Sequence, residues 1–117
     1  MNKFRKLTAL LFLVFLASCA HTQNFQQTNP VLSPNTSGEI DIYEQGEAIE
    51  ADYTLIGTMW LGESGFSESC GYEDAMYLAR KKARELGADA VQVEEVKRPD
   101  FLSTCYRVGV NIIEYND

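Results

Sequence analysis

The chain has 117 residues, with ten Lys and Arg against seventeen Asp and Glu, and a formal net charge of −7 at pH 7. This length leaves room for one small domain. The excess of acids argues against binding of nucleic acid, which depends on neutralising phosphates with Lys and Arg.

The first eighteen residues have the pattern of a secretory signal peptide. Three basic residues, Lys3, Arg5 and Lys6, precede an apolar run from Leu7 to Ala17. A basic segment followed by an apolar segment and small residues is typical of such signals. The run is shorter than the roughly 20 apolar residues needed to span a bilayer. We therefore expect residues 1–18 to be removed rather than to anchor the protein.

The end of the apolar run carries a more specific motif. Leu16-Ala17-Ser18-Cys19 resembles the bacterial lipobox, which implies cleavage before Cys19 and lipidation of its thiol. The alternative is a plain secretory signal that happens to contain a cysteine. Ala20 follows Cys19, where an Asp would imply retention in the inner membrane of a Gram-negative cell. The motif thus predicts a lipoprotein anchored in the outer membrane, on its periplasmic side or at the cell surface.

Residues 19–38 are rich in Gln, Asn, Thr, Ser and Pro, a composition that predicts a disordered tether. A flexible segment of about 19 residues has an r.m.s. span of about 25 Å. His21, the only histidine, falls in this segment and is expected to be a solvated bystander rather than a metal ligand. Without residues 1–18 the chain keeps seven basic and seventeen acidic residues, a net charge of −10. This charge argues against adhesion to anionic lipid headgroups.

Residues 39–117 are predicted to form the domain. Residues 39–43 alternate polar and apolar side chains and indicate a short strand. Residues 53–61 are rich in β-forming residues and indicate a second strand, in which Gly57 marks a bulge or a close approach.

A helix is predicted over residues 72–86. Its apolar residues recur at spacings of three and four, and Gly87 follows as a cap in the left-handed conformation. The basic cluster from Arg80 to Arg84 is interpreted as a solvated face that complements the helix dipole rather than as a binding patch. The apolar stripe consists of Tyr72, Ala75, Met76, Ala79, Ala83 and Leu86.

Two more strands are predicted over residues 91–96 and 105–112. In the last strand the alternation predicts that Tyr106, Val108, Val110 and Ile112 face the same way. The order β-β-α-β-β predicts an α+β domain in which one helix covers one face of a three- to four-stranded sheet. The other face, polar at Arg107 and Asn111, is expected to be open to solvent or to a partner.

Two cysteines remain once Cys19 carries lipid. Cys70 and Cys105 form an even pair in an oxidising compartment, so we predict a structural disulfide between them. Closing a loop of about 36 residues stabilises the fold by about 3.8 kcal/mol in the chain-entropy model. The alternatives are two free thiols, a metal-binding pair or a catalytic cysteine, but the sequence contains neither a CxxC pair nor a nearby histidine.

The domain resembles the RcsF family of outer-membrane lipoproteins that sense envelope stress and, more loosely, the YbjQ family of small domains described as metal-binding. The shared features are the glycine-bearing second strand, the cysteine before an Ala-rich helix, Ala88-Asp89-Ala90-Val91, and Cys105-Tyr106-Arg107. The resemblance covers roughly residues 40–113 and implies that Cys70 and Cys105 form one of two RcsF disulfides. The second would fall near Val96 and Asn111, where no cysteine stands.

Three classes of function follow. We expect an outer-membrane-anchored interaction or sensor module in envelope stress signalling, with the membrane and an envelope protein as partners. The alternative is a small-ligand or metal-binding module of the envelope. An enzyme is the least favoured class, because Glu94 and Glu95 are expected on opposite faces of a strand, where they make a poor acid/base pair. No catalytic residue, metal ligand or cofactor is predicted.

Overall fold

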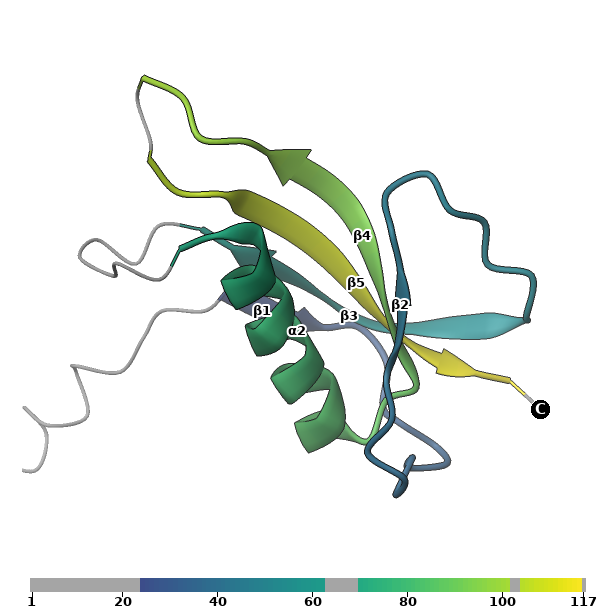
Figure 1. The fold of residues 1–117 in the computed structure, drawn as a ribbon. Coiled ribbons are helices and arrows are strands. Elements are labelled where there is room, and N and C mark those ends of the chain that lie inside the picture. The colour runs from purple at the N-terminus through teal and green to yellow at the C-terminus, as the bar shows by residue number, and fades with distance from the viewer. Residues whose placement is uncertain (1–23, 63–69, 102–103, 117) are drawn as a thin grey trace, which may run out of the picture.

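The structure, a computed structural model, describes residues 24–62, 70–101 and 104–116, and these form an α+β domain as predicted (Figure 1). One helix packs against one face of a five-stranded sheet, one strand more than expected. In chain order the elements are β1 (Asn24–Gln27), β2 (Asp41–Tyr43), β3 (Tyr53–Leu61), α2 (Tyr72–Leu86), β4 (Ala90–Lys97) and β5 (Arg107–Tyr115).

The sheet is built around β5. The strand order is β1-β3-β5-β4-β2, and β5 pairs antiparallel with both β3 and β4. At one edge β1 pairs antiparallel with β3, and at the other β2 pairs parallel with β4. The long strands therefore occupy the middle of the sheet, and the two short strands cover its edges.

Helix α2 has the predicted bounds. At its start, the Gly71 N–H donates to the carboxylate of Asp74 over 3.0 Å and so satisfies one of the free groups of a helix end. At its end, Gly87 has a φ of 74°, and the N–H of Ala88 donates to the carbonyl of Ala83 over 2.9 Å. This left-handed residue confirms the predicted glycine cap.

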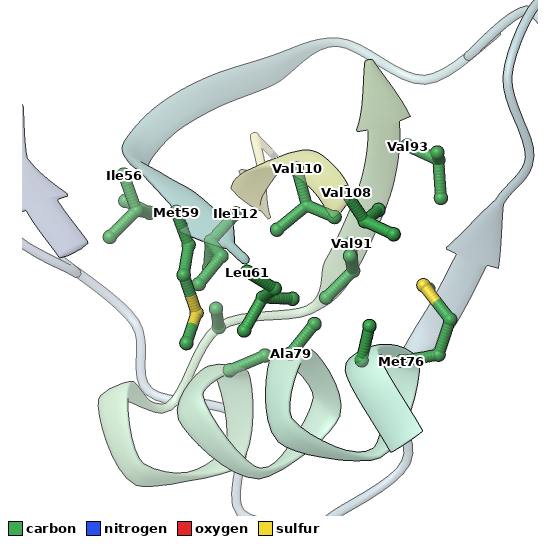
Figure 2. Packing of buried hydrophobic residues seen from close by; sticks show 13 residues of the cluster. Ile56, Met59, Leu61, Met76, Ala79, Val91, Val93, Val108, Val110 and Ile112 are labelled. Atoms are coloured by element: carbon green, nitrogen blue, oxygen red, sulfur yellow. The ribbon is translucent and has the colours of Figure 1, made fainter. Parts of the chain in front are cut away.

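The core lies between α2 and the sheet (Figure 2). The predicted stripe of the helix faces the strands, and Met76, Ala79 and Ala83 are almost fully buried. The alternation predicted for the last strand is also confirmed. The strand residues in this cluster are Ile56, Met59 and Leu61 of β3, Val91 and Val93 of β4, and Val108, Val110 and Ile112 of β5.

The strand bounds differ from the prediction mainly at the ends. Strand β3 has the predicted bounds, and β4 extends the predicted strand 91–96 by one residue at each end. The predicted strand 39–43 is confirmed only for Asp41–Tyr43, and β5 begins at Arg107 and runs on to Tyr115. The register shift between Leu55 and Gly57 confirms the predicted irregularity at that glycine.

Residues 24–38 do not form the disordered tether that was predicted for 19–38. Asn24–Gln27 forms β1, which pairs with β3 from Trp60 to Gly57. The N–H groups of Thr28 and Asn29 both donate to the carbonyl of Ile56, over 2.7 and 3.1 Å. The folded unit therefore includes residues 24–38, which lie before the predicted start at residue 39.

Gly57 explains why a polar segment can pack there. A Cβ added at Gly57 would lie 2.6 Å from the Phe25 ring and 2.6 Å from the carbonyl oxygen of Gln26. Only glycine lets the backbone of β1 and the Phe25 ring approach so closely. Phe25 thereby joins the margin of the core, with the Lys82 ammonium 4.7 Å from its ring centroid.

The rest of this segment is held by Glu114. The residue is only 4 % exposed, and its carboxylate accepts the N–H of Leu32, 3.1 Å from each oxygen, and the N–H of Ser33 over 3.0 Å. Asn35 then donates its N–H to the carbonyl of Gly87 over 2.8 Å. We call residues 24–35 the N-terminal strap, because they are fastened to β3, β5 and the end of α2.

Candidate binding face on the helix-free side of the sheet

The sheet face opposite α2 is lined mainly by polar side chains. Successive residues of a strand point to opposite faces, so the neighbours of the core residues point away from the helix. Asn111 and Arg107 of β5 do so, as the sequence predicted. The other strands add Asn24 and Gln26 of β1, Thr58 and Trp60 of β3, and Gln92, Glu94, Glu95 and Lys97 of β4. We call this surface the helix-free face.

Trp60, the only tryptophan of the chain, lies over Gly109 on this face. A Cβ added at Gly109 would come within 3.1 Å of the six-membered ring of the indole, so glycine lets the ring rest against the backbone of β5. The ammonium of Lys97 lies 5.7 Å from the ring centroid, in the range of a cation–π contact. The indole is thus held in place and only partly exposed.

Asn111 organises the polar groups beside Trp60. Its side-chain amide donates to the Glu94 carboxylate over 2.8 Å and to the side-chain oxygen of Gln92 over 3.1 Å. Both of its N–H groups are therefore used within the face. The contact positions Glu94 as an acceptor that still has free lone pairs.

The expectation that Glu94 and Glu95 lie on opposite faces is wrong. The register between β4 and β5 shifts between Val93 and Glu95, because β4 carries an extra residue there. Such a β-bulge breaks the two-residue period of the strand. Both glutamates consequently line the helix-free face, where Glu95 lies 3.7 Å from the Lys97 ammonium.

These side chains surround a shallow hollow of about 360 Å³. This volume is at the lower end of the range for small-molecule sites. The hollow offers an aromatic surface, amide donors and carboxylate acceptors, which suits recognition of a polar ligand or of side chains on a partner. It is lined by Asn24, Gln26, Thr58, Met59, Trp60, Glu94, Glu95, Gly109, Val110 and Asn111.

A second polar group lies at the other end of the sheet. The hydroxyl of Tyr115 donates to the Asp41 carboxylate over 2.7 Å and lies 2.7 Å from the hydroxyl of Tyr43. Burial, followed by the hydrogen bond to Asp41, raises the pKa of Tyr115 well above its usual value of 10. Because these groups are satisfied by one another, the binding capacity of the face lies at the Trp60 end.

The predicted disulfide is present. A disulfide joins Cys70, just before α2, to Cys105, just before β5, with the two Cα atoms 5.0 Å apart. Beside it the Tyr106 N–H donates to the carbonyl of Cys70 over 3.0 Å, and the rings of Tyr72 and Tyr106 meet edge to face. The bridge therefore fixes the start of the helix against the start of the central strand.

The predicted lipidation site Cys19, His21 and the predicted signal peptide 1–18 lie outside the described residues. Within the ranges that the structure does describe, no group of three or more His, Cys, Asp or Glu side chains is placed to hold a metal ion. The same part of the chain contains no helix that is long and apolar enough to cross a membrane.

Comparison with known proteins gives no match among family models, curated proteins or solved structures. The resemblance to the RcsF and YbjQ families therefore stays a prediction. The candidate binding face is identified from its geometry alone.

The sequence reasoning missed Trp60 and the two strap residues of the hollow, Asn24 and Gln26. A local signal existed for Trp60, because it alternates with Met59 and Leu61 along a predicted strand and so must point away from the core. Nothing comparable marked Asn24 and Gln26, which reach the face only because the strap pairs with β3.

Proposed function

We propose that this chain is an outer-membrane lipoprotein, anchored through Cys19, whose domain is a non-catalytic binding module. The observation that carries the binding role is the hollow at Trp60, with its indole fixed on Gly109 and amide and carboxylate groups around it. The motif at Leu16–Cys19 supports the anchor. The disulfide between Cys70 and Cys105 supports export, because such bonds persist in oxidising compartments.

The partner that fits the proposal best is another protein of the cell envelope, with a sensing role of the RcsF type. The helix-free face is broad, and around the hollow it spans the four strands β1, β3, β5 and β4. It presents both hydrogen-bond donors and hydrogen-bond acceptors. Tryptophan is enriched among the residues that dominate the energy of protein interfaces. The size of the hollow favours the second candidate, a small polar ligand of the envelope.

Site-specific photocrosslinking in intact cells tests the binding face. A photoreactive residue at Thr58, exposed at the hollow, is expected to give a discrete adduct with one envelope protein. The control is the same residue at Ala48, which is exposed in the loop between β2 and β3. Equal adducts from both positions would contradict the proposed face. Absence of a protein adduct, together with a small molecule retained by wild type and lost in Trp60→Ala, would favour the second candidate.

The anchor is tested separately by metabolic labelling with an alkyne fatty acid. Wild type is expected to be labelled and to sediment with outer membranes, and Cys19→Ser is expected to lose the label. Cys70 and Cys105 remain in that variant, so it also shows whether either of them takes up lipid. Unlabelled wild type, or a labelled Cys19→Ser variant, would contradict lipidation at Cys19.

A further inference from the structure

The positive charge of the domain is concentrated on one helix. Four of the seven Lys and Arg in residues 19–117 lie between Arg80 and Arg84 of α2. The sequence interpretation treated them as a solvated face and took the net charge of −10 as an argument against contact with lipid headgroups. The structure adds to both interpretations, because it shows where these charges lie relative to the N-terminal strap.

The outermost part of the helix combines an aromatic residue with cations. Tyr77, Lys81 and Arg84 follow one another at spacings of four and three, so they form one row on the side of α2 away from the sheet. All three are exposed, and Tyr77 is 60 % exposed. We call these three residues the basic row. Tyrosine is enriched where proteins meet the headgroup level of a membrane.

The strap limits how far the lipid attachment point can lie from this helix. Phe25 lies beside α2, with the Lys82 ammonium 4.7 Å from its ring centroid. Six residue steps separate Phe25 from Cys19, which limits their separation to about 22 Å even in a fully extended chain. A tether free up to residue 38 would have imposed no such limit.

Local charge, rather than net charge, decides which face meets the headgroups. At physiological ionic strength charges act over a Debye length of about 8 Å, so only the surface nearest the membrane contributes. From Tyr77 to the end of α2 there are four cations and one acid, Glu85. The opposite face of the sheet presents two acids, Glu94 and Glu95, beside two cations, Lys97 and Arg107, so it carries no excess of positive charge.

We propose that the basic row of α2 rests on the phospholipid headgroups of the membrane that holds the acyl chains of Cys19, and that the hollow at Trp60 therefore faces away from that membrane. This contact rests on the proposed anchor, and it adds the orientation of the domain relative to the membrane. The helix and the helix-free face lie on opposite sides of a single sheet (Figure 1). Contact of the helix with the membrane therefore makes the helix-free face point away from it.

The test uses the purified, acylated full-length mature chain in nanodiscs of phosphatidylethanolamine and phosphatidylglycerol that contain a headgroup spin label as quencher. Trp60 is the only tryptophan, so its fluorescence reports on the helix-free face and should be weakly quenched. The Tyr77→Trp variant retains Trp60, and its additional fluorescence should be strongly quenched. Raising the salt to 1 M should reduce that quenching, because the contact is electrostatic.

A matched pair of charge reversals controls for net charge. In the Tyr77→Trp background, Lys81→Glu removes a cation from the basic row, while Arg98→Glu makes the same change to an exposed residue after β4. Loss of one basic residue near the surface is expected to lower the ratio of docked to undocked protein at least about fivefold. Arg98→Glu is expected to leave the quenching at position 77 unchanged.

Two results would overturn the contact while leaving the anchor in place. One is equal quenching of Trp60 and of the tryptophan introduced at Tyr77, and the other is an equal effect of Lys81→Glu and Arg98→Glu in acylated protein. The mass of the N-terminal peptide, measured on the same preparation, shows whether Cys19 is acylated. A mass without acyl chains would overturn the proposed anchor and the contact together.

Discussion

Replacing Glu114 by Gln should release the N-terminal strap. The carboxylate accepts the N–H groups of Leu32 and Ser33 in a site that is 4 % exposed. A hydrogen bond to a charged group contributes about 1.5–3 kcal/mol net, and glutamine keeps only one acceptor oxygen while turning an NH₂ group toward donors. We therefore expect Glu114→Gln to lower the free energy of unfolding by about 2–3 kcal/mol.

Two measurements check this value. With a urea m value of about 1–3 kcal/mol/M, the unfolding midpoint should fall by about 0.7–3 M. Amide hydrogen exchange at Leu32 and Ser33 should accelerate about 30-fold or more, since 1.4 kcal/mol corresponds to a factor of ten. The matched control is Glu95→Gln, whose side chain is 53 % exposed and lies 3.7 Å from the Lys97 ammonium. It should change the stability by less than about 0.5 kcal/mol, because exposed ion pairs contribute little.

Two results would contradict this role of Glu114. One is exchange of the Leu32 and Ser33 amides at unprotected rates in the wild type, and the other is an equal shift of the urea midpoint by Glu114→Gln and Glu95→Gln. The first result would mean that the strap is not docked in solution, and the second that the buried carboxylate does not hold it.

Three further predictions concern other parts of the fold. Replacing Cys70 and Cys105 by serine should cost about 3.8 kcal/mol, measured by urea unfolding, and thiol labelling of denatured, non-reduced wild type should find neither thiol free. Gly57→Ala should cost about 1–3 kcal/mol and expose β1 to proteolysis, because the new Cβ would meet the Gln26 carbonyl oxygen at 2.6 Å; an unchanged proteolysis pattern would contradict the close approach. Burial and the bond to Asp41 keep Tyr115 protonated in the folded state above pH 10, where the unfolded chain loses that proton, so stability should fall as the pH rises above 10. Tyr115→Phe should flatten this decline in unfolding experiments between pH 9 and about 12, and an equal slope in both proteins would argue against it.

The helix and the central strands could be predicted because their signals are local. The spacing of apolar residues from Tyr72 to Leu86, followed by Gly87, predicted both ends of α2. Alternation along the chain likewise predicted which residues of β5 face the core. Each of these patterns is decided within one element, so no knowledge of distant neighbours is needed.

The strap and the bulge could not be predicted in the same way. Asn24–Gln27 has one apolar residue in four, and it becomes a strand only because Gly57, about thirty residues away, leaves room for Phe25. An extra residue in β4 moved Glu94 and Glu95 to one face, and only the pairing with β5 reveals that insertion. For Glu114 the partners are backbone N–H groups about eighty residues earlier, which no sequence period can show.

The pairing of β1 along a single edge also has a mechanical consequence. A pull applied to the N-terminal end of the strap acts first on the bonds between β1 and β3, which begin at Asn24 and Trp60. The next contacts along the strap are the hydrogen bonds that Leu32 and Ser33 donate to Glu114. Beyond them the disulfide holds the start of α2 to the start of β5 covalently. Tension from an anchor would therefore lengthen this protein at its strap before it disturbed the core.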